Sequence, residues 1–207
     1  MLKATAQEGP QKGTKGRIIE AALETLREDG FAGASARTIA KRGGFNQALI
    51  FYHFGTVNDL LLAALDRTSE LRMAKYGEAV KGVDSVGEAI QVATDLYRED
   101  LASGHITVLS ELIAGSLVRP ELGPQIVERM EPWIDLAESA VRNAMGSIGL
   151  VELVPPRTIA YAIVALYLGV DLLSHLEDDN SRAEAMFASA QELGGLLSRL
   201  GGNAGNK

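Results

Sequence analysis

Apolar residues recur every three or four positions along most of the chain, which is the spacing of one face of an α-helix. The strict alternation of apolar and polar residues that marks a half-buried β-strand is absent from the sequence. Glycine or proline separates the periodic runs, as expected where helices end. The pattern therefore predicts an all-α fold of about nine helices.

The bounds of the expected helices follow from these runs and from the capping residues beside them. In chain order the helices cover residues 14–29, 35–42, 47–53, 56–80, 86–102, 105–118, 124–147, 156–177 and 181–200. Gly30 is expected to end the first helix, and Pro132 is expected to kink or break the seventh near Glu131. Residues 1–13 and 201–207 are expected to be a flexible N-terminal arm and a flexible tail.

The second and third helices carry the pattern of a helix-turn-helix. This motif needs a small residue where the helices cross, a residue that turns the chain at positive φ, and an apolar residue that packs the second helix onto the first. Ala40, Gly44 and Ile50 occupy these places. Together with the first helix they predict a three-helix DNA-binding domain over residues 14–55, followed by a helical domain over residues 56–200.

The third helix is expected to enter the major groove of DNA with its N-terminal end forward. Ile50 and Phe54 must face the core, which leaves the start of the helix free to contact bases. Gln47 suits the edge of an adenine, and Ala48 and Leu49 suit a thymine methyl group. Base reading is therefore assigned to the first turn of this helix.

Phosphate contacts are expected from residues on both helices of the motif. Tyr52 and His53 lie late in the third helix and carry groups that can donate to a phosphate. Arg37 and Thr38 lie at the start of the second helix, where the DNA backbone would run. Ser35 caps that helix, whose N-terminal amides add a further anion site.

Charge is distributed unevenly along the chain, although the net charge is −7. Up to Thr56 there are eight Lys and Arg against five Asp and Glu, and the remainder carries 12 against 22. A basic head on an acidic body indicates an anionic partner for the head alone.

The stretch SARTIAKRGGFNQALIFYHFGT, which begins at Ser35, and the NDLL that begins at Asn58 resemble the DNA-binding domain of the TetR family. That family carries Thr-x-x-Ile-Ala, then Ala-Gly-Val-Ser, then Leu-Tyr-x-His-Phe, then Lys-x-x-Leu. The similarity covers residues 16–65, and the chain length and the helical C-terminal part agree with it. The resemblance implies a ligand-responsive homodimer that represses transcription by binding double-stranded DNA at a palindromic operator.

Three positions depart from the family pattern. Phe51 replaces the usual tyrosine, Leu49 replaces a threonine or serine, and Val57 replaces a lysine that often meets a phosphate. Phe51 and Phe54 are expected in the core whether or not the domain binds DNA. Affinity is then expected to depend on Tyr52, His53, Thr56 and an arm formed by Lys12, Lys15 and Arg17. The complete set of expected DNA-binding residues is Lys15, Arg17, Ser35, Arg37, Thr38, Asn46, Gln47, Ala48, Leu49, Tyr52, His53 and Thr56.

The helix expected over residues 156–177 is apolar nearly all round, so it needs packing partners on two sides. A second subunit can cover one side and form a four-helix bundle with the last helix, a dimer face that the resemblance also implies. A monomer in which these stripes are ordinary core is the alternative. The expected interface residues are Ala162, Ala165, Leu166, Gly169, Leu173, Met186, Phe187, Ala190, Leu193 and Leu197.

The resemblance further implies an effector pocket enclosed by the fourth to eighth helices. The candidate lining residues are Tyr97, Leu109, Leu112, Met130, Trp133, Tyr161 and Tyr167, although for any one of them plain core packing is the favoured role. His105, Glu111 or Asp171 are the candidate polar anchors. Because these helices lack charge runs, a small and largely apolar effector is expected, acting through the fourth helix on the separation of the two recognition helices.

Other functional classes find little support in the sequence. It has no P-loop, dinucleotide-binding glycine pattern, paired-histidine zinc motif, cysteine or nucleophile motif, so no catalysis, metal or cofactor is expected. The start of the chain lacks a signal-peptide pattern and the apolar run 159–170 is short, which favours a cytoplasmic protein without a membrane span. A helical protein-interaction module without DNA binding is the remaining alternative, which Phe51 and Val57 keep open.

Overall fold

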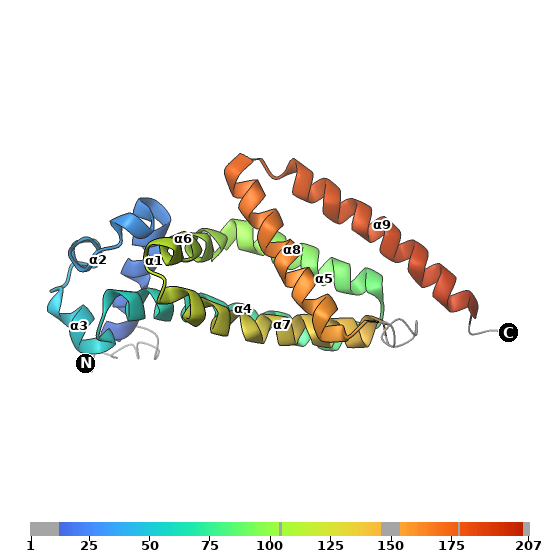
Figure 1. Ribbon diagram of the computed structural model, residues 1–207, viewed down its shortest axis with the longest axis horizontal. Coiled ribbons are helices and arrows are strands. Elements are labelled where there is room, and N and C mark those ends of the chain that lie inside the picture. Colours follow the sequence, from blue (N-terminus) through green and yellow to red (C-terminus); the bar gives the residue numbers. More distant parts are fainter. Residues whose placement is uncertain (1–12, 104, 146–153, 178, 205–207) are drawn as a thin grey trace, which may run out of the picture. The chain divides into compact units, whose positions relative to one another are not determined.

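The computed structural model describes the backbone of residues 13–103, 105–145, 154–177 and 179–204. Within these ranges the fold is all-α, as predicted, with nine helices and no strand (Figure 1). The helices are α1 (Thr14–Gly33), α2 (Ala36–Gly43), α3 (Ala48–Phe54), α4 (Val57–Lys81), α5 (Val86–Ser103), α6 (His105–Val118), α7 (Leu122–Met145), α8 (Pro156–Glu177) and α9 (Ser181–Ala204). The arm expected over residues 1–13 lies almost wholly outside the described residues, and α9 runs on into the segment expected as a tail.

The helices group into two compact units. Unit 1 consists of Met1–Thr68 and Thr107–Ile126, so it holds α1 to α3, the first half of α4, most of α6 and the start of α7. Unit 2 consists of Ser69–Ile106 and Val127–Lys207. The domain boundary expected after Gly55 divides the chain by expected function and does not coincide with the boundary between the packing units. It stays a prediction.

The turn between α2 and α3 has the geometry that its sequence predicts. Gly44 follows α2 in the left-handed conformation (φ 65°, ψ 39°), and its N–H donates to the carbonyl of Ala40. Ala40 is buried where α2 packs against α1, and Ile50 of α3 is fully buried. Gly44 therefore supplies the positive φ that the motif requires.

The first helix is longer than expected and is bent at Gly30. Gly30 adopts φ 68° and ψ −178°, and one further helical turn follows it up to Gly33. The N–H of Phe31, which the bend frees, donates to Oε2 of Glu111 in α6 at 2.7 Å. The Phe31 ring lies against Gly115 of α6. Helix α6 therefore belongs to the core of unit 1, which the sequence alone does not predict.

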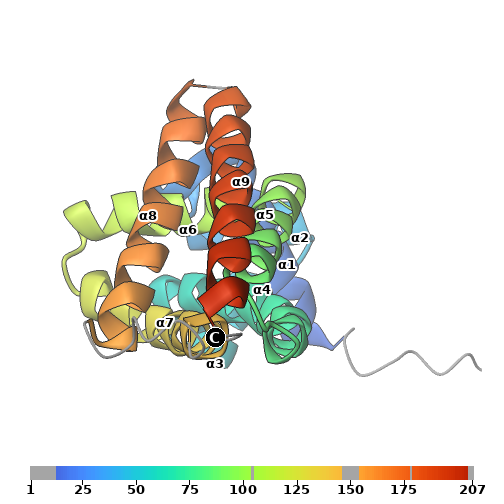
Figure 2. The same cartoon turned by 90° about the vertical axis from the view of Figure 1, so that its right-hand side faces the viewer.

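Unit 2 is built around α5, which packs along α9 while α8 runs beside α9 (Figure 2). Its core holds Tyr97 of α5 with Ala183 and Phe187 of α9, and Tyr167 and Val170 of α8 pack on this cluster. Pro132 lies inside α7 without dividing it into two helices, so of the expected kink or break the break is wrong and the kink stays a prediction.

Helix α8 is unusually exposed for so apolar a segment. Within the described residues its stretch Pro156–Ser174 is long and apolar enough to cross a membrane, and two bent helix pairs raise the number of such candidates to three. Only 17% of that stretch is buried, and Leu166, Leu173 and Leu176 are each more than half exposed. Large exposed apolar patches are typical of surfaces that contact proteins, membranes or ligands.

Candidate nucleic-acid interface

Helix α3 offers most of its surface to solvent. Ile50 is its buried residue, and the Tyr52 side chain is 82% exposed. Gln47 and Ala48 are exposed at the start of the helix, and Phe51 is 50% exposed rather than in the core as expected. Phe51 points about 100° round the helix from Ile50. Phe54, also expected in the core, is half-buried. The outward face is thus wider than the sequence indicates.

Polar residues at the helix ends fix the direction in which each helix points. The Ser35 hydroxyl accepts from the N–H of Thr38 at 3.1 Å, and the side-chain oxygen of Asn46 accepts from the N–H of Ala48 at 2.9 Å. The Thr56 hydroxyl accepts from the N–H of Asp59 at 3.0 Å. These three candidates therefore hold α2, α3 and α4 in place, whatever they touch on DNA.

Cationic side chains of unit 1 divide into exposed and paired groups. Lys15, Arg17 and Arg37 are exposed, and Arg17 reaches the carbonyl of Gly43 at 3.4 Å. Arg42 instead pairs with Glu28 and Asp29 at the end of α1, and these hydrogen bonds raise its pKa. Thr38, Leu49 and His53 are half-buried at the edge of the same surface.

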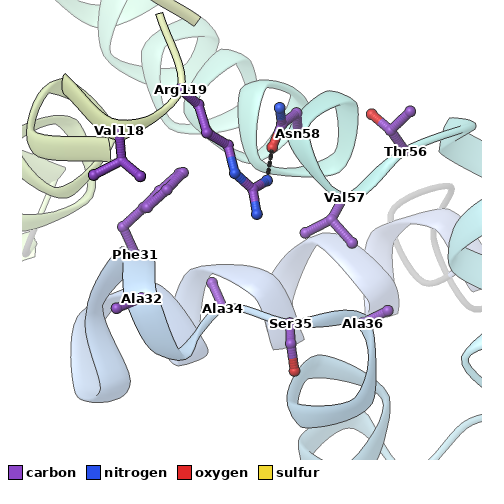
Figure 3. Close-up of a pocket in the computed structure, with 10 residues that line it drawn as sticks. All are labelled: Phe31, Ala32, Ala34, Ser35, Ala36, Thr56, Val57, Asn58, Val118 and Arg119. Atoms are coloured by element: carbon purple, nitrogen blue, oxygen red, sulfur yellow. Dashed lines mark hydrogen bonds between the residues drawn. The ribbon is translucent and has the colours of Figure 1, made fainter. Parts of the chain in front are cut away.

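A hollow of about 540 Å³ lies in unit 1 beside the start of α2 and α4 (Figure 3). Arg119, which follows α6, places its guanidinium over the ring of Phe31 at 5.4 Å and hydrogen-bonds to Asn58 of α4. Val57, at the position of the expected phosphate-binding lysine, lines this hollow and is half-buried. The end of α6 is therefore connected to both the bend of α1 and the start of α4.

The expected effector-binding residues fall in both units. Leu109 and Leu112 are buried in unit 1, where Glu111 already accepts the Phe31 N–H. In unit 2 the rings of Tyr97 and Tyr167 meet edge to face at 6.3 Å. Three further candidates of unit 2 differ in exposure: Met130 and Trp133 are half-buried, whereas Tyr161 is 65% exposed.

Unit 2 also holds a polar cluster in which the sequence predicts Asp171, Tyr167 and Trp133 as functional residues, but not Arg72 or Asp100. Arg72 of α4 forms a buried ion pair with Asp100 of α5, which also accepts the hydroxyl of Tyr167. The Arg72 guanidinium lies 4.8 Å from the centre of the Trp133 ring. Charged residues within predicted helices can indicate a buried polar cluster. Arg72 and Asp100 are 28 positions apart, however, so no local sequence pattern predicts that they form a pair.

Burial controls the ionisation of this cluster. Desolvation raises the pKa of Asp100 to about 6, although the charge of Arg72 and the Tyr167 hydroxyl act in the opposite direction. Desolvation, with the charge of Asp100, raises the pKa of Asp171 to about 8. The pKa of Tyr167 is also raised, first by desolvation and then by the charge of Asp100. Asp171 is thus held largely protonated near neutral pH.

The expected dimer residues are likewise divided between surface and core. Leu166, Leu173 and Leu193 are each more than half exposed, as an interface requires of a single chain. Phe187 is buried against Tyr97 and Met186 packs on the same cluster, so both belong to the core of unit 2 instead. The remaining candidates lie on the same two helices: Ala162, Ala165, Gly169 and Ala190 are exposed or half-buried, and the side chain of Leu197 is outside the described residues.

Comparison with known proteins identifies the chain by both sequence and fold. Residues 18–64 match the family described as bacterial regulatory proteins, tetR family. The regulator UidR of Escherichia coli K12 is 23% identical over 189 residues, which span 91% of this chain and 92% of UidR. FadR of Bacillus subtilis, solved with stearoyl-CoA, matches with a TM-score of 0.73 at 19% identity, covering 86% of this chain and 95% of FadR. The multidrug binding protein EbrR, solved with imidazole, matches with a TM-score of 0.61 at 26% identity over 86% of this chain and 94% of EbrR.

A helix-turn-helix that presents an exposed short helix beside exposed cations defines a DNA-binding protein. Together with these similarities, it shows that the chain belongs to the TetR family of transcriptional regulators. The family consists of regulators rather than enzymes, in agreement with the lack of catalytic motifs in the sequence. It also favours DNA binding over the alternative of a helical interaction module.

Proposed function

We propose that the chain is a cytoplasmic repressor that binds a palindromic operator as a homodimer and leaves it when a small molecule binds to unit 2. The observation that carries the DNA-binding half is the exposure of α3, where Tyr52 is 82% exposed and Gln47 is exposed at the first turn. An aromatic hydroxyl and an amide so placed have no role in packing and suit a nucleic-acid surface.

On the operator, the first turn of α3 reads the bases. Gln47 pairs with an adenine edge, and Ala48 and Leu49 contact thymine methyl groups. Tyr52 and His53 bind phosphates on one side of the groove. The other candidates contribute charge and positioning around it: Lys15, Arg17, Ser35, Arg37, Thr38, Asn46 and Thr56.

The dimer is supported by the exposed stripe of α8. Leu166 is 59% exposed and Leu173 is 58% exposed, and both lie on a helix that its own unit buries poorly. A second copy of α8 and α9 covers this stripe and completes a four-helix bundle. Two α3 helices related by a dyad then read two half-sites, which one short helix cannot do with useful affinity.

Effector response is supported by ligands in structurally similar proteins and by contacts within unit 1. FadR was solved with stearoyl-CoA and EbrR with imidazole. In unit 1 the segment of α6 holds the bend of α1 through Glu111 and the start of α4 through Arg119. A ligand that displaces α4 or α6 therefore has a physical connection to the helices that present α3.

The DNA-binding proposal is tested with DNA selected by the full chain from a random-sequence pool. Tyr52→Ala is expected to weaken binding about fivefold, the effect of one lost hydrogen bond, at all sequences alike. Gln47→Ala is expected to weaken binding about 5- to 100-fold and to relax the preference at a single base pair. Fluorescence anisotropy at several salt concentrations measures both effects.

Leu117→Ala is the control for these variants, because Leu117 is 84% exposed on α6 and belongs to the same unit. Its affinity should equal that of the native chain. Selected sites without two-fold symmetry, or unchanged affinity in both α3 variants, would refute the proposed surface. A reporter gene placed behind the selected site decides between repression and activation.

A further inference from the structure

Asp171 of α8 is a buried carboxylate without a partner. The residue is 2% exposed, and neither side-chain oxygen has a hydrogen-bond partner in the described part of the chain. Burial of such a group without hydrogen bonds costs free energy, and native proteins rarely retain one without a function.

Most of the polar groups around Asp171 already have other partners. Tyr167, one turn before it on α8, donates its hydroxyl to Asp100. Ser174, one turn after it, hydrogen-bonds to the hydroxyl of Tyr97 at 2.9 Å. The Arg72 guanidinium pairs with Asp100 through Nη2, and its Nε has no hydrogen-bond partner in the described part of the chain, so it does not reach Asp171. The face of α8 turned toward α5 therefore leaves two acceptors open at Asp171.

The charges that act on Asp171 are those of Asp100 and Arg72. The guanidinium that acts on Asp171 already pairs with Asp100, so an ionised Asp171 adds a negative charge that this ion pair does not balance. The rings of Tyr97 and Tyr167 lie together where this face of α8 meets α5. Aromatic rings attract cations. A bound cation would supply both the missing charge and the missing hydrogen-bond donors.

We propose that Asp171 anchors a cationic group, an ammonium or amidinium, of an effector whose remaining body is apolar. The proposal rests on the function proposed above, because it names the chemistry of the ligand that unit 2 recognises. It replaces the purely apolar effector expected from sequence with an amphipathic cation. An anionic group is disfavoured beside Asp171 once this carboxyl group is ionised.

The test uses lipophilic amines, each paired with the alcohol of the same skeleton, from benzylamine with benzyl alcohol to octylamine with octanol. Isothermal titration of the full chain at pH 8 is expected to show at least one amine that binds about 10- to 100-fold more tightly than its alcohol. Asp171→Asn removes the charge with little change in shape and is expected to abolish this preference while the affinity for the alcohol stays the same.

Asp95→Asn is the matched control, because Asp95 is an exposed carboxylate on α5 in the same unit. It should keep the amine preference of the native chain. If no amine binds more tightly than its alcohol, or if Asp171→Asn keeps the preference, the anchor is not Asp171 and the proposal is wrong.

A second readout is the pH dependence of amine binding. Asp171 titrates with a pKa raised to about 8 in the presence of Asp100, Arg72, Tyr97 and Tyr167, so an amine must displace a proton to bind below that pH. Affinity is therefore expected to rise from pH 6 to pH 8 by up to about tenfold per unit in the native chain and to stay level in Asp171→Asn. A level profile in the native chain would contradict the proposal.

DNA binding separates this inference from the function on which it rests. The amine that binds is added to the complex of the native chain with its selected DNA, and release of the DNA is expected. An amine that binds through Asp171 without releasing DNA overturns the repressor mechanism and leaves the cation site intact. Release of DNA by alcohol and amine at equal free concentrations would overturn the cation site and leave the repressor mechanism intact.

Discussion

Gly30 is the residue whose backbone most constrains the fold of unit 1. Its φ of 68° and ψ of −178° belong to a region that glycine occupies almost alone. A Cβ at this position would also lie 2.9 Å from Oε2 of Glu111. The bend of α1 and the contact with α6 thus both depend on the absence of a side chain.

Gly30→Ala is therefore expected to lower the free energy of unfolding by about 1–3 kcal/mol, measured by urea denaturation. The control is Gly77→Ala, because Gly77 lies inside α4, where an added methyl group would meet no atom within 4 Å. That variant is expected to stabilise the chain by about 0.5–1 kcal/mol, since alanine is the better helix former. Equal changes in the free energy of unfolding in the two variants would show that the bend does not require a glycine at Gly30.

Asp171 gives a stability prediction that needs no ligand. Its pKa is raised from 3.8 to about 8 in the folded chain, mainly by burial and then by the charge of Asp100, with Arg72 opposing. Between these two values the folded state holds a proton that the unfolded state has lost, so the free energy of unfolding falls as pH rises and levels off above about 8. The loss is at most about 1.4 kcal/mol per pH unit.

Urea denaturation of the native chain and of Asp171→Asn from pH 4.5 to 8.5 measures this effect as a difference. Asp100, whose pKa is raised to about 6, acts in the same direction over the lower part of the range in both proteins and cancels. The free energy of unfolding of the native chain should fall relative to that of Asp171→Asn as pH rises. A constant difference would mean that Asp171 titrates as an ordinary carboxyl group.

At the scale of elements, the local sequence pattern predicts the helices and the turn between them. It predicts few of the contacts between residues that are far apart in the chain. The spacing of Ala40, Gly44 and Ile50 is enough to place the helix-turn-helix, because each residue acts on its immediate neighbours. The contact between Phe31 and Glu111 joins residues 80 positions apart, and no periodicity in the sequence predicts it. The prediction of a buried Phe51 is wrong for a related reason: hydrophobicity alone does not say which apolar side chains of α3 reach the core, and Ile50 does so whereas Phe51 does not.

The junction of α1 and α6 offers the sharpest test at this scale. Glu111 accepts the N–H of Phe31 at 2.7 Å in a part-buried site, so Glu111→Ala leaves that donor unsatisfied. A loss of about 1–3 kcal/mol in the free energy of unfolding is expected, measured by urea denaturation. Glu111→Gln keeps an oxygen at the same reach and should recover most of the loss. If the two variants are equally stable, the hydrogen bond does not hold the junction.

At the scale of the whole molecule, sequence predicts which surfaces are unusual but not what covers them. The apolar character of α8 on several sides is plain in the sequence, and the structure adds that Leu166 and Leu173 face outward while Phe187 faces inward. That distinction depends on how α5, α8 and α9 pack, which residues far apart in the chain decide together. By length and composition α8 could also cross a membrane, although the sequence pattern favours a second copy as its partner.

Leu173→Glu decides between these partners of α8. A glutamate on a surface that is apolar in the dimer buries an unpaired charge, which costs several kcal/mol at each of the two symmetry-related positions, so the variant is expected to sediment as a monomer where the native chain sediments as a dimer. Leu71→Glu is the control, because Leu71 is 57% exposed on α4, outside α8 and α9, and should leave the dimer intact. The monomer should keep its helical circular dichroism and bind a single half-site, but lose most of its affinity for the palindrome, since the second recognition helix is no longer held beside the first. A Leu173→Glu monomer that binds the palindrome as tightly as the native dimer would show that α8 does not join the two DNA-reading heads, and a native chain that sediments with phospholipid vesicles would assign the stripe to a membrane instead.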